Sequence, residues 1–341
     1  MAITDVLNRL VDGGDLTQDE VTGTMDAVME GLLTPAQIAG FIVALRMKGE
    51  TAEEVVGAAA SMRRHATYID AGARSVVDTC GTGGDKAGTF NISTTAAFVA
   101  AGAGVSVAKH GNRAVSSQCG SADVLAELGV NIDADPLVME QCLQEHGIGF
   151  LFAPRMHPAM KHAIGPRREL GVRTIFNMLG PLTNPAAATG QVLGVFAPEL
   201  TEMFATALRD LGARRAFVVH GSDGLDEITC TGPTRVSELR DGQVRTYELS
   251  AEQLLGDLCD PDEIAGGAPP AGAAILRGVL EGKPGGPRQV ALLNAAAAVV
   301  AGEKADRIED GLQLATQAVD SGTALAKLDI LIEETQTTEN G

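Results

Sequence analysis

The segment 78–91 carries the residues best suited to chemistry in this sequence. It contains four glycines, three threonines and two carboxylates, and a stretch with helical character begins directly after it at Ile92. Glycine lets backbone N–H groups approach an anion closely, and the N-terminus of a helix attracts negative charge. The segment therefore predicts a phosphate-binding loop. A tight turn between a strand and a helix has a similar composition, so the glycines alone leave both interpretations open.

A second polar segment follows a predicted strand that ends at Ala108. Its residues are Lys109, His110, Gly111, Asn112, Arg113, Ala114, Val115, Ser116 and Ser117. Ligands of parallel sheets gather at the carboxyl ends of the strands. Lysine, arginine, hydroxyl groups and exposed glycine backbone can together hold several phosphate oxygens. Alone, the segment is equally typical of a solvated loop, but beside a glycine-rich loop it favours an anionic ligand.

Two adjacent acids follow another predicted strand, which ends near His220. Asp226 and Glu227 offer the hard oxygen ligands that Mg²⁺ prefers, and Asp223 is a weaker third candidate. Adjacent acids are common on protein surfaces. Their place after a strand, in a chain with two predicted phosphate-binding segments, nevertheless favours a magnesium site.

The distribution of charge supports an anionic ligand. The formal net charge is −18, with 44 acidic residues, yet no acid occurs between Asp85 and Asp123. A second stretch, from His146 to Pro198, contains Glu169 as its only acid. An acidic protein needs such locally positive stretches to bind an anion, because its overall field repels one. The same net charge argues against a nucleic-acid partner and against attachment to an anionic membrane.

Cysteine usage and missing motifs exclude further classes. The five cysteines form no C-x-x-C pair, which predicts reduced thiols and no zinc site. No G-x-G-x-x-G follows a strand and no P-loop is complete, so dehydrogenases and P-loop NTPases are excluded. His157 and His162 are assigned to packing or helix ends. No stretch is apolar over the length of a transmembrane helix and no apolar leader follows Met1, so we expect a cytoplasmic protein.

The elements that must position these residues fall into two units. Residues 1–70 predict a small helical domain, with Thr34-Pro35 and Thr51 as helix starts. Residues 71–341 alternate short apolar strands with helices, which predicts an α/β domain with a mostly parallel central sheet. The predicted strands lie at 76–77, 105–108, 148–152 and 216–220, and the predicted helices at 92–101, 121–128, 136–146, 200–211, 285–301 and 308–319.

Other segments complete this prediction. Residues 227–250 predict some antiparallel strands, and residues 266–272 a flexible connector. The chain from Glu333 onward is expected to fray. A helical stretch near 157–185 is expected to pack on the first domain, although it is far from it in sequence.

Seven segments, in this order along the chain, carry a resemblance to a known family. They are Gly81–Asp85, Asn91–Thr94, Lys109–Arg113, Gly120–Asp123, Arg173–Asn177, Gly180–Pro185 and Asp223–Glu227. The chain resembles the anthranilate phosphoribosyltransferases of tryptophan biosynthesis, a nucleoside phosphorylase-like phosphoribosyltransferase family. The resemblance covers nearly the whole chain.

The resemblance implies a Mg²⁺-dependent transfer of the 5-phosphoribosyl group from phosphoribosyl pyrophosphate (PRPP) to the amino group of anthranilate. The products are N-(5-phosphoribosyl)anthranilate and pyrophosphate, in the second step of tryptophan biosynthesis from chorismate. The implied PRPP ligands are Gly81, Gly84, Asp85, Thr89, Asn91, Ile92, Ser93, Thr94, Lys109, His110, Gly111, Asn112, Arg113, Ala114, Val115, Ser116, Ser117 and Ser121.

The remaining implied roles concern metal, acceptor and assembly. Ser93 and Glu227 are implied to hold one Mg²⁺, and Asp226 with Glu227 a second. Gly81, Asn112 and Arg167 are implied to contact anthranilate. Lys109 and Arg167 are expected to act by electrostatics and positioning, without a dedicated strong base. The family also implies a homodimer that pairs through its helical domain.

Two positions depart from the family pattern. Met156 stands where a polar residue or histidine is frequent, and Phe196 where tyrosine is common.

Pyrimidine nucleoside phosphorolysis is disfavoured by Ser93 and the adjacent acids, which form a metal-binding set. A non-catalytic nucleic-acid-binding relative is disfavoured by the acidic balance and the complete motifs.

Overall fold

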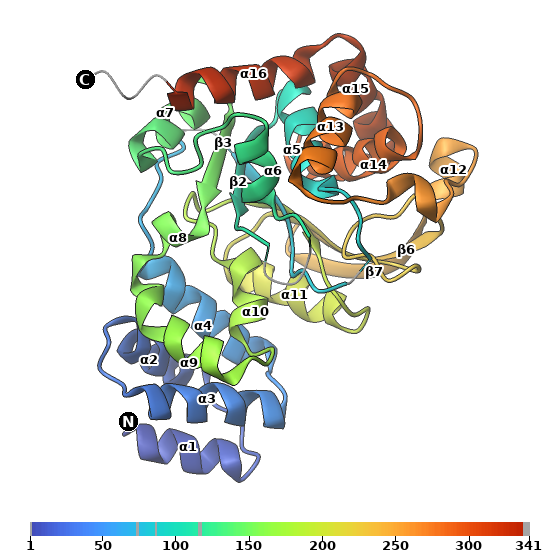
Figure 1. The fold of residues 1–341 in the computed structure, drawn as a ribbon. Helices are drawn as coiled ribbons and strands as arrows, with labels where there is room; N and C mark the ends of the chain where they lie inside the picture. Colours follow the sequence, from blue (N-terminus) through green and yellow to red (C-terminus); the bar gives the residue numbers. More distant parts are fainter. Residues whose placement is uncertain (1, 73–74, 86, 115–117, 337–341) are drawn as a thin grey trace.

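The computed structural model describes residues 2–72, 75–85, 87–114 and 118–336. Figure 1 shows two lobes, a small helical lobe that contains the N-terminus and a larger lobe built around a sheet. The small lobe contains the helices α1 (Ile3–Val11), α2 (Gln18–Met29), α3 (Pro35–Lys48) and α4 (Ala52–Arg64). Three of these helices begin with a threonine whose side chain closes a capping box, namely Thr17, Thr34 and Thr51.

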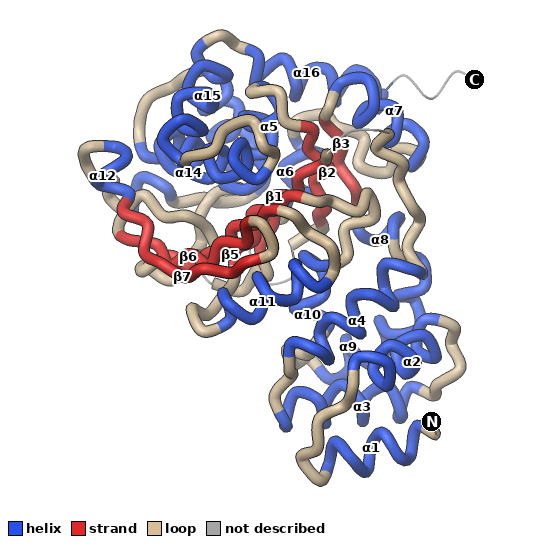
Figure 2. The backbone as a smooth tube through the Cα atoms, turned by 180° about the vertical axis from the view of Figure 1, so that it is seen from behind, coloured by secondary structure: helices blue, strands red, loops and turns tan. Residues whose placement is uncertain are grey.

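A second segment of the chain returns to the helical lobe. Its helices are α8 (Ala153–Met156), η1 (Pro158–Met160), α9 (Lys161–Leu170), α10 (Phe176–Leu179) and η2 (Gly180–Leu182). Helix α9 packs against α2 and α3, and α10 packs against α4 (Figures 1 and 2). Segments that are about 100 residues apart in sequence therefore build one lobe.

The large lobe contains a seven-stranded sheet with the order β3-β2-β1-β4-β5-β6-β7. Its strands are β1 (Val76–Gly81), β2 (Ser106–Gly111), β3 (Ile148–Phe152), β4 (Gly190–Gly194), β5 (Arg215–Gly221), β6 (Pro233–Arg240) and β7 (Gln243–Ser250). Strands β1 to β5 are parallel, and β6 and β7 are antiparallel additions at one edge. The predicted fold class, with a helical domain and a mostly parallel sheet, is confirmed.

Helices bury both faces of the sheet. The remaining helices are α5 (Ile92–Gly102), α6 (Ser121–Glu127), α7 (Pro136–His146), α11 (Leu200–Asp210), α12 (Ala251–Leu255), η3 (Pro261–Ile264), α13 (Pro269–Leu280), α14 (Gly286–Ala301), α15 (Ile308–Asp320) and α16 (Thr323–Gln336). Consecutive residues of β4 belong to different hydrophobic clusters, since Val192 packs with α5 and α14 and Leu193 with α11 and the helical lobe. The second cluster joins the two lobes. No helix within the described ranges is both long and apolar enough to cross a membrane.

Two predictions about the C-terminal third were wrong. Residues 266–272 do not form a flexible connector, because the Gly266 N–H donates to the Gly88 carbonyl at 2.8 Å and α13 begins at Pro269. The chain also does not fray between Glu333 and Gln336, and the rest of that prediction, residues 337–341, lies outside the described residues. Helix α16 continues to Gln336, and the buried Thr335 accepts a hydrogen bond from the Asn131 N–H at 3.1 Å, which ties this last turn to the lobe.

Candidate active site

Strand β1 ends at Gly81, and the loop 82–91 that follows carries the first predicted ligands. A Cβ atom at Gly81 would collide with the carboxylate of Asp226. Gly83 and Gly84 have φ angles of +66° and +85°, which glycine adopts at little cost. The loop therefore turns at the carboxyl end of β1 and holds its backbone against Asp226.

Asp85 and Thr89 lie further along this loop. The Asp85 Oδ1 accepts a hydrogen bond from the Ala87 N–H at 3.3 Å, as in an Asx turn. Thr89 forms an isolated antiparallel bridge with Ala265. The loop is thus anchored near its end by the segment that precedes α13.

Helix α5 begins directly after the loop, with Asn91, Ile92 and Thr94 in or beside its first turn. The Asn91 Nδ2 donates to the Cys119 carbonyl at 3.1 Å. Asn91 Oδ1 and Thr94 Oγ1 are buried and find no hydrogen-bond partner among the described residues. Buried polar atoms normally form hydrogen bonds. These two oxygens form none with the described residues, so they are available to a polar ligand at the helix start.

Lys109 lies near the carboxyl end of β2 and is only 4% exposed. Its Nζ donates to the Thr79 carbonyl and, at 3.3 Å, to Ser93 Oγ. Burial lowers the pKa of Lys109, and the carboxyl groups of Asp78 and Glu227 act in the opposite direction. The fold thus holds a buried amine next to Ser93.

The adjacent acids follow β5 and face the glycine loop. Asp226 Oδ2 accepts from the Gly83 N–H at 2.7 Å, and Glu227 Oε1 accepts from the Ser93 N–H at 3.1 Å. Burial, helped by Asp85, raises the pKa of Asp226 to about 7. Burial and Asp226 raise the pKa of Glu227 to about 8. Crowded, buried carboxyl groups favour a nearby cation, because it offsets their mutual repulsion.

The oxygen atoms of Asp226, Glu227 and Ser93 suit Mg²⁺, which takes only some of its ligands from the protein. They suit less well a metal whose ligands all come from the protein. In the described part of the chain, no three histidine, cysteine or acidic side chains are grouped so as to hold a metal. Mg²⁺ usually takes one or two carboxylates from the protein and its other ligands from water and substrate phosphates. Asp226, Glu227 and the Ser93 hydroxyl satisfy that pattern.

Asp123 and Ser121, from the first turn of α6, hold the start of the loop between β2 and α6. Asp123 Oδ2 accepts from the Ala114 N–H at 2.8 Å, and Asp123 Oδ1 pairs with Arg113 at 3.0 Å. The Ser121 Oγ accepts from the Asn112 N–H at 3.2 Å. The loop is therefore closed on the first turn of α6. The predicted ligands Val115, Ser116 and Ser117 lie outside the described residues.

His110 and Gly111 end β2, and His110 meets a histidine from the other lobe. The Nε2 atoms of His110 and His157 are 3.2 Å apart, and the His110 Nδ1 lies 3.1 Å from the Gly180 carbonyl. Burial is the main cause that lowers the pKa of His110 to about 3 and that of His157 to about 4. Both rings are therefore neutral near pH 7.

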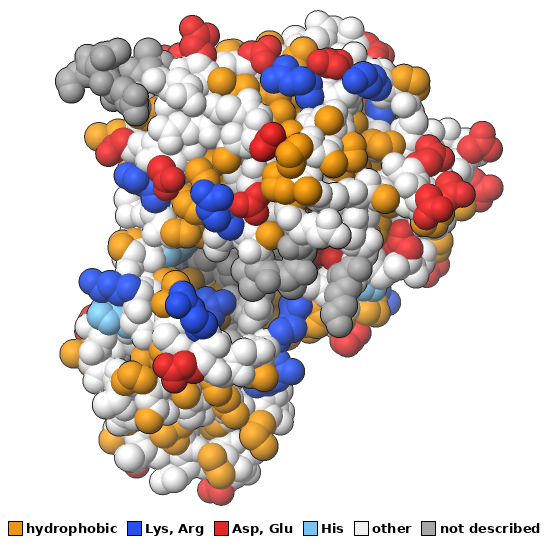
Figure 3. Space-filling view, in the orientation of Figure 1, with side chains coloured by type: hydrophobic (Ala, Val, Ile, Leu, Met, Phe, Trp, Pro, Cys, Tyr) orange, Lys and Arg blue, Asp and Glu red, His pale blue; other side chains and the backbone are white. Residues whose placement is uncertain are grey.

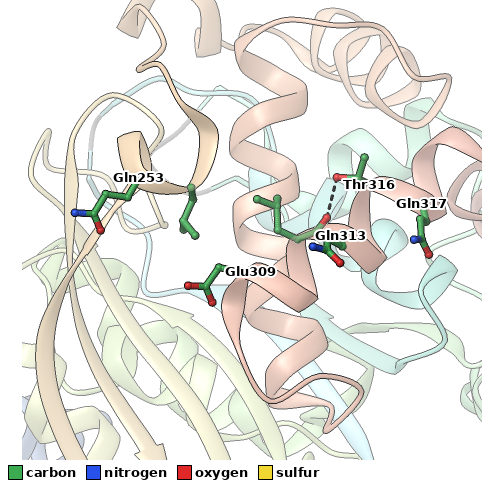
Figure 4. Close-up of a pocket in the computed structure, with 7 residues that line it drawn as sticks. Gln253, Glu309, Gln313, Thr316 and Gln317 are labelled. Atoms are coloured by element: carbon green, nitrogen blue, oxygen red, sulfur yellow. Dashed lines mark hydrogen bonds between the residues drawn. The ribbon is translucent and has the colours of Figure 1, made fainter.

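These groups lie where the two lobes meet. Figure 3 shows a hollow between the lobes with Lys and Arg side chains around it. A separate surface pocket of about 520 Å³ lies between α12 and α15 and is lined by Gln253, Leu254, Glu309, Leu312, Gln313, Thr316 and Gln317 (Figure 4). None of the predicted ligands lines this pocket. Those that the structure describes lie mainly at the carboxyl ends of β1, β2 and β5, so we place the candidate site there.

Comparison with known proteins shows the family to which the chain belongs. The model of the glycosyl transferase family a/b domain matches residues 73–325, and that of its helical bundle domain matches residues 4–66. The anthranilate phosphoribosyltransferase of Desulfosudis oleivorans is 60% identical, over 98% of each chain. That of Desulfatibacillum aliphaticivorans is 56% identical, over 99% of each chain. The chain belongs to the anthranilate phosphoribosyltransferase family.

Solved structures agree with this assignment. The anthranilate phosphoribosyltransferase of Thermus thermophilus is 42% identical and has a TM-score of 0.93, over 98% of this chain and 100% of that one. The Saccharomyces cerevisiae enzyme in complex with PRPP and Mg is 27% identical, with a TM-score of 0.88 over 98% of each chain. The predicted function, phosphoribosyl transfer to anthranilate in tryptophan biosynthesis, is therefore confirmed.

The anthranilate phosphoribosyltransferase fold places Arg167 differently from the other predicted ligands. It lies on α9, in the helical lobe, with its guanidinium carbon 4.9 Å from the centre of the Phe176 ring. Burial lowers the pKa of Arg167. Within the described residues it forms no hydrogen bond with Gly81 or Asn112, the other predicted anthranilate ligands.

Sequence reasoning missed two contacts of this anthranilate phosphoribosyltransferase site. His157 is buried and flanks α8 and η1, as its assignment to packing or a helix end predicted, but its contact with the predicted ligand His110 was not foreseen. Arg173 was noted only as part of a locally positive stretch and of a family motif, yet it donates to the Gly83 carbonyl. Both contacts join residues far apart in sequence, so local patterns gave no signal for them. Met156, which departs from the family pattern, is buried, and Phe196 lies beneath Arg173.

Proposed function

We propose that this chain binds PRPP on the loops after β1 and β2 and at the start of α5, through the ligands named from its sequence. The observation that carries the proposal is the pairing of Asp226 with the Gly83 N–H and of Glu227 with the Ser93 N–H. These contacts join two buried acids to a glycine loop and a helix N-terminus, which is a suitable combination for a metal-bound pyrophosphate.

We also propose that the reaction uses two Mg²⁺ ions per monomer. Ser93 and Glu227 would hold one ion, and Asp226 with Glu227 the other. The raised pKa values of Asp226, at about 7, and Glu227, at about 8, support a cation here, because a positive charge would stabilise both carboxylates. When bound, Mg²⁺ would neutralise negative charge on the pyrophosphate group.

The acceptor is proposed to approach from the helical lobe. Arg167 offers a planar guanidinium that can bind the anthranilate carboxylate through two hydrogen bonds. Gly81 lies against the Asp226 carboxylate, and Asn112 directly follows β2. The lone pair of the anthranilate amine attacks C1 of the ribose while the bond from C1 to pyrophosphate oxygen breaks. The new C–N bond is completed as the nitrogen releases a proton to solvent.

The residues of the chain contribute by position and charge. Lys109 lies beside Ser93 and supplies a donor near the negative charge of the pyrophosphate. An aromatic amine attacks through a lone pair, so orientation of the two substrates supplies much of the rate without a strong base. No single residue is therefore assigned as general base or nucleophile.

The test is the loss of anthranilate fluorescence with purified protein, PRPP and Mg²⁺. We expect fluorescence to fall only when all three are present, and each omission serves as a control. Calorimetric titration with PRPP and Mg²⁺, without anthranilate, tests the binding site separately. Folded protein that neither consumes anthranilate nor binds PRPP would overturn the proposal.

We further propose a homodimer that pairs through the helical lobe and works in the cytoplasm. The exposed apolar side chains of Val11, Leu32, Met47 and Ile164 on that lobe support a pairing surface. The five cysteines are all free thiols, as expected in a reducing compartment. Light scattering after gel filtration tests the dimer, and Met47→Glu should reduce the measured mass to that of a monomer. Cell fractionation tests the location.

A further inference from the structure

Arg173 lies between α9 and α10 and contacts both lobes. Its backbone carbonyl accepts a hydrogen bond from the guanidinium of Arg46, on α3 of the helical lobe. Its own guanidinium donates from two nitrogens, each 3.2 Å away, to the carbonyl of Gly83. One residue thus connects a helix of the small lobe to the glycine loop of the large lobe.

The aromatic ring of Phe196 fixes the orientation of this guanidinium. The guanidinium carbon of Arg173 lies 4.0 Å from the ring centre, at stacking distance. The Phe196 N–H donates to Thr82 Oγ1 at 3.1 Å, and the Thr82 N–H donates to the Gly194 carbonyl at 2.9 Å. The ring that supports Arg173 is therefore itself anchored to the start of the glycine loop.

Gly83 is held from both sides of its peptide unit. Its carbonyl accepts from Arg173, and its N–H donates to Asp226 at 2.7 Å. A Cβ atom at Gly84 would collide with the Arg173 guanidinium, so this arginine also occupies the space that a side chain there would need. The positive φ angles of Gly83 and Gly84 are thus stabilised by contacts from outside the loop.

We propose that Arg173 is a positioning residue that holds the glycine loop 82–85 in the shape that receives PRPP. The inference rests on the proposed PRPP site and adds to it a link to the helical lobe through Arg46. A loop that is already ordered loses little conformational freedom when its ligand binds, so the tether strengthens PRPP binding without contacting the ligand. A displacement of α3 relative to the sheet would reach the loop through the same contacts.

The test compares Arg173→Ala and Arg173→Lys with Arg168→Ala as the matched control. Arg168 lies on the nearby α9 and is exposed, and its side chain forms no hydrogen bond or ion pair with any described residue. We expect Arg173→Ala to weaken PRPP binding about tenfold in calorimetry, since two charge-assisted hydrogen bonds are lost. We expect Arg173→Lys to recover only part of this loss, because an ammonium lacks the planar two-pronged geometry.

Two further readouts separate positioning from general destabilisation. In the ligand-free protein, amide hydrogen exchange of residues 82–85 should become at least about tenfold faster in Arg173→Ala and remain unchanged in Arg168→Ala. The KM for PRPP should rise while the KM for anthranilate stays within about twofold. Arg46→Ala cuts the tether on the helical side, and it should accelerate loop exchange in the same direction by a smaller factor.

The outcomes also separate this inference from the proposed function. Wild-type protein that binds no PRPP would overturn the PRPP site, whereas the exchange experiment would still test the tether. Unchanged loop exchange in both Arg173 variants would overturn the tether even if PRPP binds tightly. Equal rises in both KM values, together with a lower melting temperature, would show that Arg173 merely stabilises the fold.

Discussion

Among the predicted ligands, Arg167 has the position that best separates the binding of anthranilate from the binding of PRPP. It lies on the helical lobe, apart from the loops proposed to hold PRPP. Arg167→Lys keeps the charge but loses the planar pair of N–H donors, so we expect the KM for anthranilate to rise about tenfold. The KM for PRPP should stay nearly unchanged. Steady-state kinetics with each substrate varied in turn gives both values, and Arg168→Lys is the control. Equal effects on both KM values would contradict the assigned role.

Glu227 carries an electrostatic cost in the metal-free protein. Its pKa is raised from 4.5 to about 8 by burial and by Asp226. Between these two values the folded chain holds a proton that the unfolded chain has released, so stability falls as the pH rises through this window. Glu227→Gln removes the titrating group and keeps an oxygen that can accept from the Ser93 N–H.

We therefore expect Glu227→Gln to increase the free energy of unfolding by about 1–3 kcal/mol at pH 8 and by much less at pH 5. Transferase activity should fall at least about tenfold, because a neutral amide is a poorer Mg²⁺ ligand than a carboxylate. Urea unfolding in the presence of a chelator measures the first effect. An equal gain at both pH values would point to better packing and not to relief of charge.

At the scale of elements, the carboxylate of Asp123 binds both ends of the described part of the loop between β2 and α6. Burial opposes ionisation of Asp123, but the N–H donors of Ala114 and Gly120 and the guanidinium of Arg113 together lower its pKa. Asp123→Asn cannot satisfy all three donors, because one side of an amide is itself a donor.

We expect Asp123→Asn to lower the free energy of unfolding by about 1–2 kcal/mol and to raise the KM for PRPP several-fold. The exposed Asp133, whose carboxylate forms no hydrogen bond or ion pair among the described residues, offers Asp133→Asn as the control. Urea unfolding and steady-state kinetics measure the two effects. A loss of stability with an unchanged KM would mean that the loop does not help to bind PRPP.

Local signals predicted some elements and could not predict others. Thr34 with Pro35 and Thr51 predicted the starts of α3 and α4, and both threonines close capping boxes. Strand β4 was not predicted, because only three residues lie between its terminal glycines, Gly190 and Gly194. It forms a strand because it pairs with β1 on one side and β5 on the other. Helix α13 was missed because its prolines and glycines resemble a loop, although proline is favourable in a first helical turn.

The site shows the same division. The glycine loop, the polar segment that begins at Lys109 and the adjacent acids were predicted from composition and from the strands that precede them, both of which are local features of the sequence. The pairing of Arg173 with Gly83 spans 90 residues and that of His110 with His157 spans 47 residues. Such contacts depend on how the lobes pack, so a single sequence carries no pattern for them.

At the scale of the whole molecule, two buried histidines link the lobes. His110 ends a strand of the large lobe, and His157 precedes η1 in the segment that returns to the helical lobe. Their Nε2 atoms are 3.2 Å apart, so one ring must donate and the other accept, which requires an unprotonated acceptor nitrogen. Their pKa values of about 3 and about 4 mean that the folded chain resists protonation.

This resistance makes stability depend on pH in a defined direction. The unfolded chain gains a proton on each histidine near pH 6.5, whereas the folded chain gains them only near pH 3–4. The contribution of the pair is therefore complete above about pH 6.5 and is lost as the pH falls, by at most about 2.7 kcal/mol per pH unit. Carboxyl groups with raised pKa values make the protein more stable as the pH falls. The contribution of the histidines is therefore measured by comparing the wild type with a variant.

His157→Gln keeps a donor and an acceptor but cannot be protonated in this range. Between pH 7 and pH 5 we expect the variant to lose about 2 kcal/mol less free energy of unfolding than the wild type, as measured by urea unfolding. His162→Gln, on α9 and outside the pair, is the control for replacing a histidine of the helical lobe. Parallel profiles for the wild type and His157→Gln would mean that His157 takes up its proton as readily in the folded protein as in the unfolded chain. The lobes would then be held together by the shared hydrophobic cluster, with no pH-dependent contribution from this histidine.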